Sequence, residues 1–110
     1  AQGLSRDPAE QARIVDWSMA SDRHAVAAAI RDVMTTDARP GLAAMTTPVT
    51  ALYAADADGG APAAVADAMW TREYSTLPGA TLTRVDGSRH FIMADQPRRF
   101  AEAVDRFLAD

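Results

Sequence analysis

The stretch ATLTRVDGSRHF, residues 80–91, decides the fold of this chain. Its first half is a short apolar run with β-branched residues, which predicts a strand over residues 80–85. Gly87 then marks a turn, and His90 follows on a loop. After that loop, Pro97 opens a helix with a clear apolar stripe. The rest of the chain can be interpreted as the structure that gives His90 a carboxylate partner.

A second strand is predicted over residues 49–54, VTALYA, whose apolar side chains indicate a strand covered on both faces. An acidic loop follows at residues 56–61, and then a helix from Pro62 to about Tyr74. This connection is long enough for the right-handed crossover that makes two strands parallel. Asp56 and His90 then follow carboxyl ends at one sheet edge, where strands lie about 4.8 Å apart and side chains can meet.

The N-terminal part predicts two short, alanine-rich helices. The first begins at Pro8 and ends at Ala20, and Ser21 is the expected N-cap of the second. Their modest apolar content suits an outer layer, so we expect a helical cap or lid segment over residues 1–45 and an α/β core over residues 46–110. The second helix has an apolar face formed by Val26, Ile30, Val33 and Met34. Four aromatic residues are expected to pack in the core or cap: Trp17, Tyr53, Trp70 and Tyr74.

Composition excludes several classes of function. The chain has a net charge of −4 and scattered arginines, so we expect neither nucleic acid nor a membrane as a partner. It contains no cysteine, lysine or asparagine, which removes thiolate zinc sites, P-loops and Schiff-base chemistry. We expect no cofactor and no metal. Asp56, Asp58 and Gly59 lack the remaining ligands of a calcium loop, and His24 is expected to be solvated on its helix.

Histidine and aspartate at one sheet edge suit nucleophilic catalysis. A histidine that takes a proton from a nucleophile becomes a cation, and an aspartate on its other nitrogen stabilises that charge. His90 is therefore the candidate general base. Asp56 is the preferred acid because it lies nearest the strand, with Asp58 as the runner-up, and the loop can also use both. Ser88 is a poor candidate nucleophile so close to His90 and is expected to shape the loop.

The order strand, acid, helix, turn, strand, histidine, helix resembles the C-terminal half of an α/β-hydrolase fold protein. The resemblance is carried by TPVTALY (47–53), Asp56, LPGA (77–80), GSRHF (87–91) and DQPRRF (95–100). It covers residues 46–110 well and residues 8–40 loosely, as the end of a helical cap. It implies a serine-type hydrolase of a small to medium ester, lactone or amide. The same fold supports carbon–carbon, epoxide and haloalkane hydrolysis, so the reaction stays open.

The nucleophile of that family is missing from this sequence. None of its serines stands in a G-x-S-x-G frame: Ser5, Ser18, Ser21, Ser75, Ser88. Because two strands do not form a stable open sheet alone, we expect the chain to work with an N-terminal half of the same fold, from a second fragment or a swapped copy. The alternatives are a non-catalytic interaction or regulatory module derived from this fold and, last, a stand-alone binding protein.

The sequence leaves the compartment open. No stretch approaches the length of a membrane span, and the first residues lack the basic-then-apolar order of a signal peptide. The first residue is Ala1, which suits a processed or cleaved product. A cytoplasmic location is one expectation. A periplasmic or secreted location is the other, if a signal peptide upstream was removed.

Overall fold

A computed structural model describes residues 1–109 and shows a mixed α/β chain, which confirms the coarse class expected from sequence. Short helices come first, and a β-α-β-α run follows. The elements are α1 (Pro8–Ala20), α2 (Arg23–Thr35), the 3₁₀ helix η1 (Arg39–Ala44), β1 (Thr50–Ala55), α3 (Ala63–Glu73), β2 (Thr81–Asp86), α4 (Ile92–Asp95) and α5 (Pro97–Ala109). No helix among residues 1–109 is both long and apolar enough to cross a membrane.

The two strands pair in parallel, as predicted. Their register runs from Thr50 opposite Thr81 to Ala55 opposite Asp86, so both carboxyl ends reach the same edge of the sheet. Each strand lies one residue further along the chain than expected. The helix α4, a single turn between His90 and α5, was not predicted, because four residues are too few to show a helical period.

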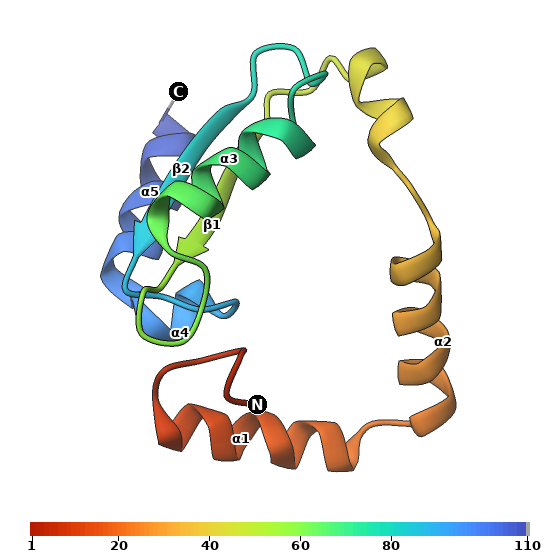
Figure 1. Cartoon of the computed structure of the whole chain (residues 1–110), viewed down its shortest axis with the longest axis vertical. Coiled ribbons are helices and arrows are strands. Elements are labelled where there is room, and N and C mark those ends of the chain that lie inside the picture. The colour runs from red at the N-terminus through yellow and green to blue at the C-terminus, as the bar shows by residue number, and fades with distance from the viewer. Residues whose placement is uncertain (110) are drawn as a thin grey trace.

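Helices cover the two faces of this narrow sheet (Figure 1). On the α3 side, Tyr53 and Ala55 pack with Ala66 into the buried core, and the Tyr53 hydroxyl donates to Asp67 at 2.7 Å. On the other side, Leu52 and the apolar stripe of α5 line a shallow hollow. The covering is incomplete, because α5 has no fully buried residue. The expectation of a strand covered on both faces therefore holds well only towards α3.

The N-terminal helices are ordered mainly by their own caps. Asp7 accepts a hydrogen bond from the amide of Ala9, and Asp22 accepts from the amides of His24 and Ala25. The expectation that Ser21 caps α2 was wrong. Its hydroxyl instead donates backwards to the Trp17 carbonyl at 2.7 Å, which leaves the stronger acceptor, the Asp22 carboxylate, to cap the helix.

These helices extend away from the α/β part in an open arc, and η1 leads the chain back to it (Figure 1). The apolar face expected on α2 faces solvent, and so does Trp17, against the prediction that it packs inside. The radius of gyration is 15.5 Å, against about 13 Å for a compact domain of this length. The accessible surface is 7912 Å², which is about 2,000 Å² more than a monomer of this mass ordinarily exposes.

Candidate functional site

The carboxyl ends of the two strands are tied together by backbone hydrogen bonds. The Ala55 carbonyl accepts from the amides of Gly87 (2.8 Å) and Ser88 (3.3 Å). Gly87 has a φ of +71°, a conformation that a residue with a side chain rarely adopts, and it turns the chain towards His90. The loop after β1 is closed by the bond from the Asp56 amide to the Ala61 carbonyl at 2.9 Å. Two separate segments therefore meet at one edge, as the sequence predicted.

Asp56 is the buried carboxylate at this edge, with only 2% of its surface exposed. Its Oδ2 accepts from the Arg89 Nε at 2.9 Å, and its Oδ1 lies 3.4 Å from the Arg6 guanidinium and accepts from the Asp58 amide at 3.2 Å. The Arg89 hydrogen bond is the main reason that the pKa of Asp56 lies below its usual value, against the opposing effect of burial. The carboxylate is held ionised.

His90 lies on the loop after β2, and its side chain is exposed. Its ring packs near that of Phe91, with 5.6 Å between the ring centroids. Asp56 accepts a hydrogen bond from Arg89, the residue before His90. Among residues 1–109, no hydrogen bond joins Asp56 to His90. Arginine has the longer side chain and carries a permanent charge, so it competes well for a buried carboxylate. The pairing of Asp56 with His90 stays a prediction.

Asp58, the runner-up candidate for the acid, is exposed, whereas Asp56 is buried. The Asp58 side chain is 75% exposed, and its carboxylate pairs with Arg6 at 3.1 Å on the outside of the loop. Its amide, by contrast, donates to Asp56, so Asp58 helps to form the turn. Ser88 is buried, and its hydroxyl donates to the Arg89 carbonyl at 2.9 Å, which is the loop-shaping role expected of it. His24 is exposed on α2.

Two glycines let the acidic loop approach the site closely. A Cβ built on Gly59 would lie 2.3 Å from the Arg89 Nη2, and one on Gly60 would lie 3.1 Å from the Asp56 Cβ. Arg89 has little freedom to move aside, because its guanidinium also donates to the carbonyls of Gln2 and Ser5. The pair of glycines therefore has a packing role in this loop.

A second cluster of polar groups surrounds Asp95, a half-buried residue of α4. Its Oδ1 accepts from the Ser5 hydroxyl at 2.6 Å and from the Arg6 amide at 2.9 Å, and its Oδ2 accepts from the Arg89 amide at 2.8 Å. Burial raises the pKa of Asp95, but these hydrogen bonds outweigh that effect and hold it below its usual value. Ser5 itself is fully buried.

Sequence reasoning missed Arg6, Arg89 and Asp95 as parts of this site. Arg89 stood beside His90 in the quoted stretch, and Asp95 stood two residues before the helix-opening Pro97. A buried acid needs a cation, so this rule could have drawn attention to the nearby arginines as partners of Asp56. Nothing in the sequence indicated that residues 2–7 would lie against a loop some ninety positions away.

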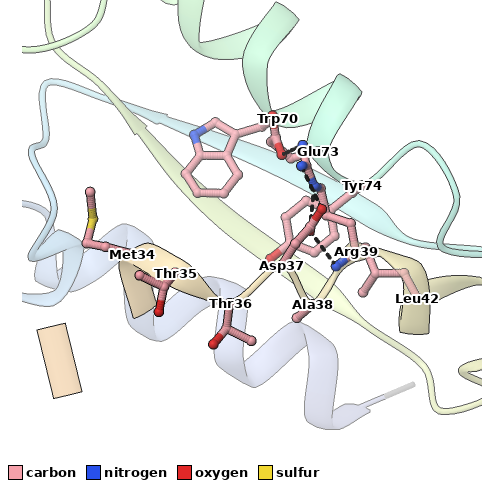
Figure 2. A pocket seen from close by; sticks show the side chains of 10 residues that line it. All are labelled: Met34, Thr35, Thr36, Asp37, Ala38, Arg39, Leu42, Trp70, Glu73 and Tyr74. Atoms are coloured by element: carbon pink, nitrogen blue, oxygen red, sulfur yellow. Dashed lines mark hydrogen bonds and ion pairs between the residues drawn. The ribbon is translucent and has the colours of Figure 1, made fainter. Parts of the chain in front are cut away.

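The hollow beside His90 is small and largely apolar, with a volume of about 300 Å³. Tyr53, Met69 and Trp70 are among the residues that line it. A larger hollow of about 580 Å³ lies at the end of α2, where Trp70 of α3 and Tyr74, which follows that helix, face the segment around Arg39 (Figure 2). There Arg39 bridges Asp37 and Glu73, at 2.7 and 3.0 Å. Trp70 lines both hollows, but only the smaller one includes His90.

Among residues 1–109, no group of three or more histidine, cysteine or acidic side chains is arranged to hold a metal ion. Comparison of the chain with protein-family models, with curated proteins and with solved structures returned no match. The fold itself defines only a coarse class, a mixed α/β chain with a pair of parallel strands. The function has to be argued from the geometry of the sheet edge.

Proposed function

We propose that this chain is the C-terminal half of an α/β-hydrolase-type enzyme, which supplies His90 as general base and Asp56 as its acid. The observation that carries the proposal is the meeting of the two loops at the carboxyl edge of a parallel strand pair, with a buried, ionised Asp56. In the proposed mechanism, His90 takes a proton from a serine outside this chain and returns it to the leaving group.

The bonding of Asp56 is compatible with that role. A carboxylate has about four acceptor positions, and three donors reach Asp56: Arg6, Asp58 and Arg89. A position remains for an imidazole N–H. Rotation of the His90 side chain towards Asp56 forms the pair in this proposal, while Arg89 continues to neutralise the carboxylate.

The nucleophile comes, in this proposal, from an N-terminal half of the same fold. Three features support a missing partner: the sheet has two strands, the apolar face of α2 is exposed, and the surface exceeds that of a compact monomer by about 2,000 Å². Obligate interfaces bury areas of this order. The substrate class is a small to medium ester, lactone or amide, and the helices α1 and α2 help to enclose it.

Turnover of an activated ester by the assembly isolated from its source tests the proposal. His90→Ala should lower kcat by about 10³-fold or more, since a general base and its proton transfers are removed. His24→Ala is the matched control and should leave kcat unchanged, because His24 is exposed on α2. Equal activity of the His90→Ala variant and the parent would remove His90 from the mechanism.

One observation favours a second candidate, a non-catalytic interaction module of the same origin. Asp56 is paired with Arg89 and Arg6 and not with His90, so the acid and the histidine are relics in this view. Labelling of the assembly with a serine-directed fluorophosphonate separates the candidates. The hydrolase proposal requires a labelled serine, and the module requires none.

A further inference from the structure

The segment at residues 2–7 lies against the loop that carries His90. The Phe91 amide donates to the Leu4 carbonyl at 2.8 Å, and the Arg89 amide donates to Asp95 at 2.8 Å. The residues directly before and after His90 are therefore both fixed through their backbone. A loop held on both sides of one residue restricts the positions that its side chain can reach.

Asp95 joins this segment to the loop. One carboxylate oxygen accepts from Ser5 and from the Arg6 amide, and the other accepts from the Arg89 amide. No other described side chain bonds both to the first seven residues and to the backbone beside His90. The Ser5 hydroxyl also accepts from the Asp7 amide at 3.1 Å, and the Gln11 side chain donates to the Ser5 carbonyl at 2.8 Å, which extends the contact to α1.

The bonds to Asp95 are of a strong kind. Hydrogen bonds to an ionised carboxylate are stronger than those between neutral groups, and the burial of Ser5 shields the bond that its hydroxyl donates to Asp95 from water. The first few residues of most domains are poorly ordered unless they are tied down. This segment is tied down at the one loop that carries the proposed general base.

We infer that residues 2–7 form a positioning segment for the His90 loop, and that Asp95 is the positioning residue that fastens it. The inference about the loop stands on the contacts alone. Its consequence for catalysis rests on the proposed function, because it takes His90 as the general base. These contacts connect residues 2–7, which lead into α1, to the loop at the carboxyl edge of the sheet.

The test uses Asp95→Asn and Ser5→Ala, with Asp105→Asn as the matched control, since Asp105 is exposed on α5. An asparagine at position 95 keeps one oxygen acceptor. Its NH₂ group replaces the other oxygen, so the bonds to that oxygen, from Ser5 and Arg6 or from Arg89, are lost. Ser5→Ala keeps the carboxylate and its two backbone donors, so it perturbs the contact without removing it. Amide exchange at Arg89 and Phe91, and the Hε1 chemical shifts of His90 and His24, are measured on the isolated assembly.

Asp95→Asn should speed amide exchange at Arg89 and Phe91 by about 10- to 100-fold, the factor that corresponds to one bond to a charged group. It should shift the His90 resonance and leave that of His24 in place. Ser5→Ala should act in the same direction by about two- to tenfold. Unchanged exchange at Arg89 and Phe91 in both variants would overturn the inference, as would equal effects of Asp105→Asn.

Ester turnover separates this inference from the proposed function. Asp95→Asn should lower kcat with little change in KM, because a misplaced general base affects the chemical step. If the loop loosens while neither Asp95→Asn nor His90→Ala affects turnover, the positioning of the loop stands and the catalytic proposal fails. If His90→Ala abolishes turnover but the loop keeps its exchange rates in both variants, the positioning role fails alone.

Discussion

The α/β part and the helical arm of this molecule are held in different ways. In the α/β part, from β1 to α5, side chains distant in sequence bury one another, and Asp56, Arg89 and Asp95 add charged contacts between segments. In the arm, α1 and α2 have good caps but expose most of their large apolar residues. Local signals are thus enough to set these helices, whereas residues 1–109 do not bury the apolar face of α2.

The largest effect should come from the buried acid. Asp56→Ala leaves the Arg89 and Arg6 guanidiniums without their buried partner, and breaking such a pair by removing one member costs about 3–5 kcal/mol. Asp58→Ala, at an exposed pair, should cost under about 1 kcal/mol. The measurement is the free energy of opening of β1 and β2, from amide exchange of the isolated assembly at increasing urea. Equal costs for the two variants would remove the distinction between the two acids.

One identical substitution in the two regions sharpens the comparison. Val85 is 2% exposed in β2, and Val33 is 77% exposed in α2. Val85→Ala should lower the opening free energy of β2 by about 2 kcal/mol, because buried methyl groups leave a cavity. Val33→Ala should change the opening free energy of β2 by under about 0.5 kcal/mol, because α2 lies away from the two strands (Figure 1). A large loss from Val33→Ala in the same exchange experiment would show that the arm does support the sheet.

Acid should loosen the site, because it protonates the carboxylates of Asp56 and Asp95. The pKa values of Asp56 and Asp95 are below their usual values, so the stability that they contribute is present above the unfolded value near pH 4. It is lost as the pH falls through their folded values. The loss should be smaller than that of Asp56→Ala, because a protonated carboxyl group still accepts hydrogen bonds. Exchange of residues 87–92 followed from pH 6 to pH 2.5 gives this profile, and a flat profile would contradict it.

The smallest effect should come from the glycine that faces Arg89. Gly59→Ala places a methyl group 2.3 Å from the pinned guanidinium, and overpacking of this kind costs about 1–3 kcal/mol. We expect the lower end, about 1 kcal/mol, because Gly59 lies in an exposed loop that can shift to relieve the clash. Gly41→Ala is the control, since nothing lies within 4 Å of its added Cβ. Exchange near Arg89 should respond to Gly59→Ala alone.

The sequence was most informative where the signal was local or periodic. The helix from Pro8, the parallel strand pair and the closing helix from Pro97 were all predicted, because caps, apolar periods and the crossover rule depend on neighbouring residues. The meeting of the Asp56 and His90 loops followed from that topology. The choice of Arg89 as the partner of Asp56, and the docking of Ser5 on Asp95, depend on side-chain reach and on long-range packing, which no local pattern contains.

Fluorophosphonate labelling of the isolated assembly tests the central claim most directly. The label is read by mass spectrometry of both polypeptides, in the parent and in the His90→Ala variant, with His24→Ala as the control. The account predicts one labelled serine, on a polypeptide other than residues 1–110, with labelling at least about 100-fold slower in His90→Ala, since the general base activates that serine. An assembly without any labelled serine, or a label on a serine of this chain, would contradict it.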